Sequence, residues 1–132
     1  MDWKEHTVDL VEFALKELLP RHKNVFVDVV FDEELDELYG ECVWEEGREF
    51  TLRVNPNMPD EIGYTIMHEM VHVKQYLRGE LRESFKPFYR RYWKGEEVPE
   101  EVGYAELPWE EEAARMEVEL FEKWCELRGY EA

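Results

Sequence analysis

The stretch from Asp60 to Arg78 constrains the fold most, because its apolar residues follow the spacing of a helix with a broad buried face. These apolar residues are Ile62, Ile66, Met70, Val73 and Leu77. Asp60 follows Pro59 and can cap the start of the helix, and Gly79 can end it. We therefore expect a long helix, most of it inside the molecule, around which the rest of the chain packs.

The middle of this helix carries His68-Glu69-Met70-Val71-His72, which matches the pattern H-E-x-x-H. Residues four apart share one face of a helix, so both imidazoles can bind one Zn²⁺ ion at about 2.0–2.1 Å. Glu69 then lies beside the metal, where it can take a proton from a zinc-bound water. The alternative is that both histidines are ordinary, partly buried side chains and that Glu69 is solvated. We predict His68 and His72 as metal ligands and Glu69 as a catalytic residue.

A catalytic zinc site usually has three protein ligands, and the sequence leaves few candidates for the third. No histidine follows His72 and no aspartate follows Asp60. His6 and His22 lie upstream, in or just after the expected first helix, and Cys125 has no supporting spacing. The third ligand is therefore expected among the downstream glutamates.

A helix is expected from Pro108 to Arg128, before Gly129, and its glutamates are the best candidates. Its expected core-facing stripe contains Trp109, Ala113, Met116, Leu120, Trp124 and Leu127. Glu110 and Glu117 lie on the border of this stripe, where a buried carboxylate needs a partner. We favour Glu110 as the ligand. Glu117 is an alternative ligand, or else the partner of a ligand histidine.

The remaining segments predict an α+β fold in one domain, residues 1–132. Residues 3–19 are expected to form a helix that Pro20 ends, and residues 25–31, 39–45 and 49–54 to form three strands. The first strand is expected to be buried, and residues 46–48 to form a hairpin turn. A short helix is expected over 85–93, whose aromatic residues would form core, cover or a lid. The fold class is thus an N-terminal helix, a small three-stranded antiparallel sheet, the zinc-motif helix and a C-terminal glutamate helix.

These motifs resemble those of the gluzincin metallopeptidases, in particular the small minigluzincins. That class pairs H-E-x-x-H with a downstream E-x-x-A, which His68–His72 and Glu110–Ala113 match. The second motif is loose, because Glu111–Ala114 also fits it, so Glu111 stays open as a ligand. The resemblance covers about residues 25–127. It implies that the strand Phe50–Val54 lines the cleft and binds an extended polypeptide substrate through a free edge. In some minigluzincins the C-terminal segment, here Glu126–Ala132, keeps the enzyme latent.

Peptide hydrolysis develops an oxyanion, which needs a hydrogen-bond donor in addition to the metal. Tyr104, six residues before Glu110, is the candidate for this catalytic role. The alternative is that Tyr104 is an amphipathic residue at the rim of the cleft. Weaker candidates for the same role are Tyr89, Tyr92, Arg90 and Arg91.

The net charge of −17 disfavours nucleic acid and anionic membrane surfaces as partners. The chain shows no apolar run of the ~20 residues that a membrane span needs and no signal peptide. Its two distant cysteines, Cys42 and Cys125, do not make a disulfide framework. We expect a cytoplasmic protein with reduced thiols.

The sequence thus predicts a zinc-dependent hydrolase that cleaves peptide bonds, an endopeptidase rather than an exopeptidase. One alternative is a non-catalytic zinc-binding interaction or regulatory protein on the same scaffold. Glu69 speaks against this alternative, because a purely structural zinc site needs no general base. A second alternative is a scaffold without metal.

Overall fold

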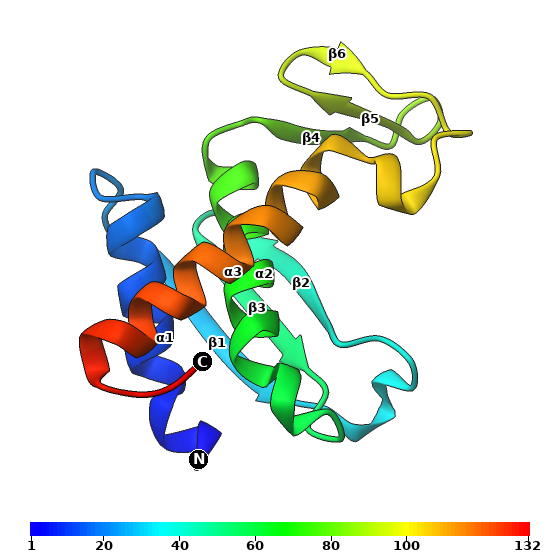
Figure 1. Ribbon diagram of the computed structural model, residues 1–132. Coiled ribbons are helices and arrows are strands. Elements are labelled where there is room, and N and C mark those ends of the chain that lie inside the picture. Colours follow the sequence, from blue (N-terminus) through cyan, green and yellow to red (C-terminus); the bar gives the residue numbers. More distant parts are fainter.

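The computed structural model describes residues 1–132 and contains three α-helices and two small sheets (Figure 1). The helices are α1 (Trp3–Leu18), α2 (Ile62–Leu77) and α3 (Pro108–Arg128). The first sheet contains β1 (Phe26–Phe31), β2 (Gly40–Glu46) and β3 (Glu49–Val54). The second sheet contains β4 (Leu81–Ser84), β5 (Arg90–Trp93) and β6 (Glu96–Glu97). The predicted α+β class is confirmed, as are the three long helices and the first three strands.

The first sheet has the order β1-β3-β2 and is mixed rather than wholly antiparallel. β2 and β3 form the expected antiparallel hairpin, with Gly47 at a positive φ in its turn. β1 instead pairs in parallel with β3. The reason lies in the connection after β1, which crosses the end of β3 before β2 begins. The buried Asn55 holds this crossing loop, because its side-chain amide donates to the carbonyls of Asp36 and Leu38.

This order corrects the expectation of a free edge at Phe50–Val54. β3 is the central strand and pairs with a neighbour on both sides. Its alternate residues Phe50, Leu52 and Val54 are buried in the core. The free edge next to α2 belongs to β2, whose outer side makes no backbone hydrogen bond.

β1 is the other edge strand, and it is only half-buried, contrary to expectation. Phe26 is 61% exposed and Val30 46% exposed, because their face of the sheet carries no helix. The alternate residues Val27, Val29 and Phe31 pack against the main core. The mostly apolar sequence of β1 therefore did not mean that both faces of this strand are buried.

α2 is the centre of the fold, as expected from its sequence. It packs on the sheet, and α1 and α3 pack on α2, so that all three helices lie on one side of the sheet (Figure 1). Gly63 lets α3 approach closely, since a Cβ there would lie 2.1 Å from the ring of Phe121. The helix begins at Ile62 after a 3₁₀ turn at Pro59–Glu61, so Asp60 is not its cap.

The predicted helix over residues 85–93 is wrong, because residues 85–89 form the loop between β4 and β5, and residues 90–93 form β5 of the antiparallel sheet β4-β5-β6. Lys94 and Gly95 both have positive φ and form the tight turn between β5 and β6. Of the predicted aromatic cluster, Trp93 packs in a small second core with Leu81, Leu107 and Trp109. Three other aromatic residues of that cluster, Phe85, Phe88 and Tyr89, are largely exposed.

α3 runs diagonally across α2 and buries most of the predicted stripe (Figure 1). Leu127 is an exception at 60% exposed, whereas Phe121 and Cys125 are buried instead. Toward its C-terminus the helix packs on α1 as well as α2, so its buried face turns away from the stripe set by Trp109.

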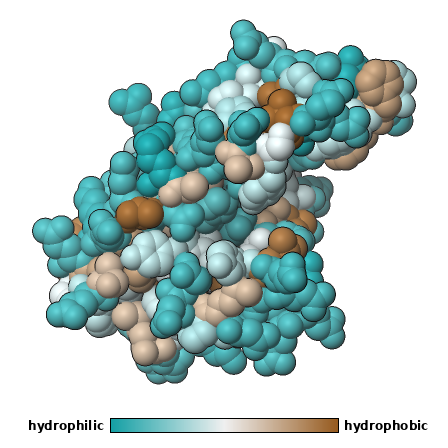
Figure 2. Space-filling view, turned by 45° about the vertical axis from the view of Figure 1, so that its right-hand side comes forward, coloured by the Kyte–Doolittle hydropathy of each residue, from teal (hydrophilic) through white to brown (hydrophobic).

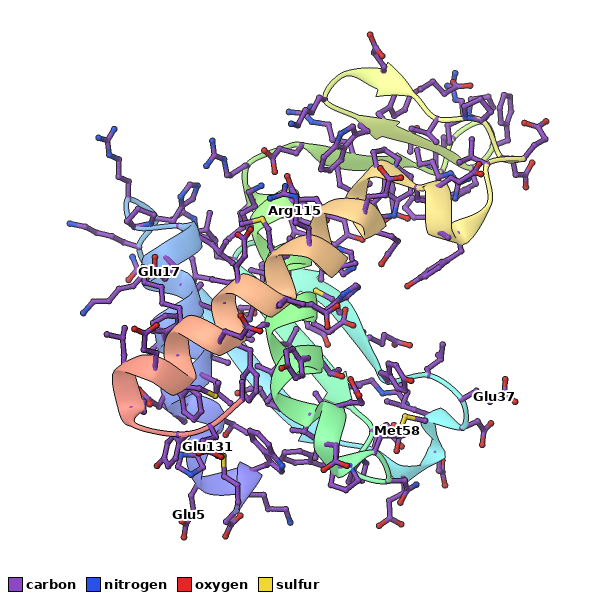
Figure 3. All side chains as sticks on the ribbon, viewed as in Figure 1. Glu5, Glu17, Glu37, Met58, Arg115 and Glu131 are labelled. Carbon is purple, nitrogen blue, oxygen red and sulfur yellow. The ribbon has the colours of Figure 1, made fainter.

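Most of the acidic side chains are exposed. Figure 3 labels four of them, with Glu37 on the opposite side of the molecule from Glu5, Glu17 and Glu131. None of the three helices combines the length and the apolarity that crossing a bilayer requires.

Candidate metal centre

The fold brings His68 and His72 of α2 together with Glu110 of α3. One donor atom from each residue lies within 4.8 Å of the others. The Nε2 atom of His68 is 2.9 Å from Glu110 Oε1, and the Nε2 atom of His72 is 3.3 Å from Glu110 Oε2. Ligand atoms that bind one tetrahedral Zn²⁺ at ~2.1 Å lie roughly 3.4 Å apart. The three predicted ligands therefore fit a zinc ion with small adjustments.

The other nitrogen of each imidazole has its own partner, which fixes the orientation of the ring. Nδ1 of His68 is 2.9 Å from Glu117 Oε1. Nδ1 of His72 is 2.7 Å from Gln75 Oε1. Both partners accept hydrogen bonds, so each Nδ1 carries a proton. Without a metal, each Nε2 is protonated as well and donates to Glu110; with a metal bound, each Nε2 would offer its lone pair to the ion instead. Glu117 is thus the partner of a histidine rather than a member of the donor cluster.

The orientation of Gln75 is itself determined by a buried polar network. Its side-chain NH₂ donates to the carbonyl of Trp109 and to Glu112 Oε1, which leaves its oxygen for His72. Glu112 also accepts from the buried Lys74, whose Nζ lies 2.8 Å from both Glu112 and Glu80. The network ties the position of His72 to the packing of α3 on α2.

The charges of the site call for a cation at its centre. Burial opposes protonation of His68, but hydrogen bonds to Glu110 and Glu117 outweigh it and raise the pKa of His68 to about 10. Burial likewise opposes ionisation of Glu110, but hydrogen bonds from His68 and His72 hold its pKa below the usual range. The carboxylates thus stabilise positive charge where the donor atoms meet, and a metal dication satisfies the same need.

Glu69 is buried next to the cluster and faces β2. Burial raises the pKa of its carboxyl above the ordinary value. Gly40 of β2 makes this arrangement possible. A Cβ at Gly40 would lie 2.5 Å from Thr65 Cγ2 and 3.3 Å from Glu69 Oε2.

A cavity of about 270 Å³ opens beside the donor atoms. Its lining includes Gly40, Glu69, His72, Tyr104 and Glu110. The ring of Tyr104 is largely exposed, but its hydroxyl donates to Glu110 Oε1 at 3.0 Å. Tyr104 therefore lies at the site, as predicted, and a small molecule or a carbonyl group has room to approach the donor cluster.

The weaker candidates lie elsewhere. The hydroxyl of Tyr89 donates to Glu83, and His6 packs against Trp124 and Tyr130. Cys125 is buried in the main core. Because Tyr130 stacks on Trp124, the C-terminal segment turns back near α1, at the opposite end of α3 from Glu110 (Figure 1).

Sequence reasoning missed Gly40, Lys74, Gln75 and Glu112. Lys74 and Gln75 stand out as polar residues inside an otherwise apolar helix, and this signal was available. Gly40 and Glu112 gave no such signal, because their role depends on which elements face each other.

No family model, curated protein or solved structure matches this chain. Only the chemistry of the site itself therefore points to a function.

Proposed function

We propose that this protein is a zinc-dependent peptidase of the gluzincin type. His68, His72 and Glu110 would hold the metal. The observation that carries the proposal is the meeting of an H-E-x-x-H helix with a glutamate of α3, beside a cavity that Glu69 also lines. A purely structural zinc site is closed by four protein ligands, whereas this donor set has three and an open side.

Each further residue has a defined part in the proposed reaction. When bound, zinc supplies Lewis acidity. The Glu69 carboxylate takes a proton from the attacking water and passes it to the leaving amine, a task that its raised pKa suits. The Tyr104 hydroxyl donates to the oxyanion that develops on the substrate carbonyl.

The proposed substrate is an extended polypeptide that pairs with the free edge of β2. Gly40 and Cys42 of this strand line the cavity at the donor cluster, and the strand continues to Glu46. A peptide paired along it would extend past the site, which favours cleavage of internal bonds.

Both cysteines are free, which suits the proposed cytoplasmic location.

The test compares zinc content and hydrolysis in the wild type and four variants purified without added metal. The wild type should carry one zinc per chain and cleave an unfolded protein substrate. Glu69→Gln should keep its zinc and lose cleavage by ~10²-fold or more. Glu110→Gln should lose both. Glu111→Gln is the matched control, because Glu111 is exposed on the same helix turn and should behave as wild type. Tyr104→Phe should keep zinc and lower kcat by ~10²-fold.

Two results would count against the proposal. Absence of zinc after titration of the wild type would exclude the metal site. Zinc binding that depends on Glu110, without hydrolysis of any substrate in a broad peptide library, would instead favour a non-catalytic zinc-binding protein.

A further inference from the structure

A second cavity lies next to the one at the candidate metal centre. It has a volume of about 500 Å³ and lies between the outer edge of β2 and the start of the second sheet. The two cavities share Glu41, Cys42 and Tyr76, so they lie side by side along β2, and we call the larger one the groove. Figure 2 shows the molecule notched between the lobe that carries β4–β6 and the body below it.

Three aromatic residues line this groove, Trp44, Tyr76 and Phe85. Trp44 of β2 lies 5.2 Å from the ring of Tyr76 and remains 45% exposed. Phe85, just after β4, is 70% exposed, and its ring centroid lies 5.4 Å from that of Tyr89. Trp44 and Phe85 thus expose apolar ring surface to water side by side with the groove, which is typical of a binding surface.

The charged residues of the groove are all acidic. Its lining contains Glu41, Glu45, Glu46 and Glu83, and no lysine or arginine. Glu41 is already paired with Arg53 of β3. Glu45, Glu46 and Glu83 form no ion pair, so three carboxylates remain without a cationic partner.

Glu83 is held in a fixed orientation. Its two carboxylate oxygens accept hydrogen bonds from the hydroxyl of Tyr76 at 3.0 Å and that of Tyr89 at 2.8 Å. Burial, followed by the charge of Glu83, raises the pKa of Tyr76, so this phenol stays protonated and donates. Two neutral donors orient the carboxylate without neutralising it, which leaves its charge available to a ligand.

From these contacts we propose that the groove between β2 and β4 binds a lysine or arginine side chain of a polypeptide that pairs with the edge of β2. The cation would contact Glu83 and the aromatic faces, while its aliphatic stem lies along Trp44. An acidic side chain would be repelled, and an apolar one would desolvate carboxylates without pairing them. The proposal deepens the proposed peptidase function by naming its substrate class.

The test measures binding rather than cleavage, using the Glu69→Gln protein with and without added zinc. The probes are alanine-threonine octapeptides in which one lysine is moved along the chain, with norleucine or glutamate as matched replacements. Tryptophan fluorescence reports binding near Trp44. At the best position, lysine should bind about tenfold more tightly than norleucine. Glutamate should bind more weakly still, and added salt should reduce only the preference for lysine.

Variants then locate the cation. Glu83→Gln should abolish the preference for lysine, and the double variant Glu45→Gln/Glu46→Gln should reduce it even if Glu83→Gln does not fold. Glu96→Gln is the matched control, since Glu96 is exposed on β6 outside the groove. Equal affinity for lysine and norleucine peptides, or a preference that survives in both variants, would overturn the proposal. The binding measurement needs neither zinc nor hydrolysis. A failure of the lysine-binding proposal is therefore distinguishable from a failure of the proposed peptidase function.

Discussion

At the scale of single residues, the two candidate ligand histidines differ in what supports them. His68 contacts a carboxylate at the surface of α3, Glu117, whose side chain is 23% exposed. His72 contacts Gln75, which is completely buried and belongs to a larger network. The support of His68 can therefore be changed without disturbing the core.

We predict that Glu117→Gln lowers zinc affinity about tenfold while one zinc still binds per chain. The neutral amide accepts a weaker hydrogen bond from His68, so the ring is held less firmly and its nitrogen is a weaker ligand. Competition with a chromogenic chelator measures the affinity. Glu119→Gln, an exposed position on the same helix, should leave it unchanged. A complete loss of zinc in Glu117→Gln would show instead that Glu117 is a ligand.

The predictability of the site also differs residue by residue. His68, Glu69 and His72 were predictable because their relation is local, since all three lie within five consecutive residues of one helix. Glu110 followed from elimination and from its place on the border of a helix stripe. Gln75 and Glu112 act across the interface between α2 and α3, which no local spacing describes.

At the scale of elements, the approach of α2 to β2 places Glu69 beside the cavity. Gly40 and Thr65 meet at this approach, with no room for a further carbon between them. A side chain at position 40 therefore has to move the strand or the helix.

We predict that Gly40→Ala destabilises the fold by about 1–3 kcal/mol, because the added Cβ overpacks this contact. Urea unfolding measures the change in the free energy of unfolding. Thr65→Ser removes the carbon that would lie 2.5 Å away, so the double variant should recover part of the loss. The recovery stays partial, since the carbonyl of Arg53 lies 3.0 Å from the same Cβ.

Gly103→Ala serves as the control, because a Cβ there meets nothing within 4 Å. A Gly40→Ala protein as stable as the wild type would mean that α2 and β2 lie farther apart than described here.

The helices and strands were predictable where the regular spacing of apolar residues extends over many residues. The three helices extend over four or more turns of regular spacing, and the predicted bounds of α3 agree with the structure. The strands of the second sheet are only two to four residues long, too short for a clear period. Their aromatic residues therefore suggested a helix where a small sheet forms.

At the scale of the whole molecule, the two ends of the chain are tied together far from the candidate metal centre. Asp9 of α1 accepts hydrogen bonds from Trp124 and Arg128 of α3. Hydrogen bonds from Arg128 lower the pKa of Asp9, against an opposing effect of burial and with a further contribution from Trp124. The tie adds to the ring contacts between α1 and α3, which are those of Trp3 with Phe121 and of His6 with Trp124.

We predict that Asp9→Asn lowers stability by about 1 kcal/mol at pH 7, a modest value because water screens this partly exposed pair. Since the folded-state pKa is lowered, the stabilisation is present above the unfolded pKa and is lost as pH falls through the folded value. The difference between variant and wild type should therefore shrink below about pH 4.

Urea unfolding at neutral and acidic pH measures both quantities. Glu12→Gln, an exposed position of α1 without an ion pair, should show no such pH dependence. A difference between Asp9→Asn and wild type that stays constant with pH would assign the effect to packing rather than to the charge of Asp9.

The sequence by itself determined the α+β class, the long helices and the histidines and glutamate of the motif, because each depends on residues close together in the chain. It also indicated Glu110, since few other ligands were left. Only the tertiary structure decided the order of the sheet, the free edge at β2 and the network behind His72. These depend on which surfaces meet across long stretches of chain, and that choice is made by packing rather than by local spacing.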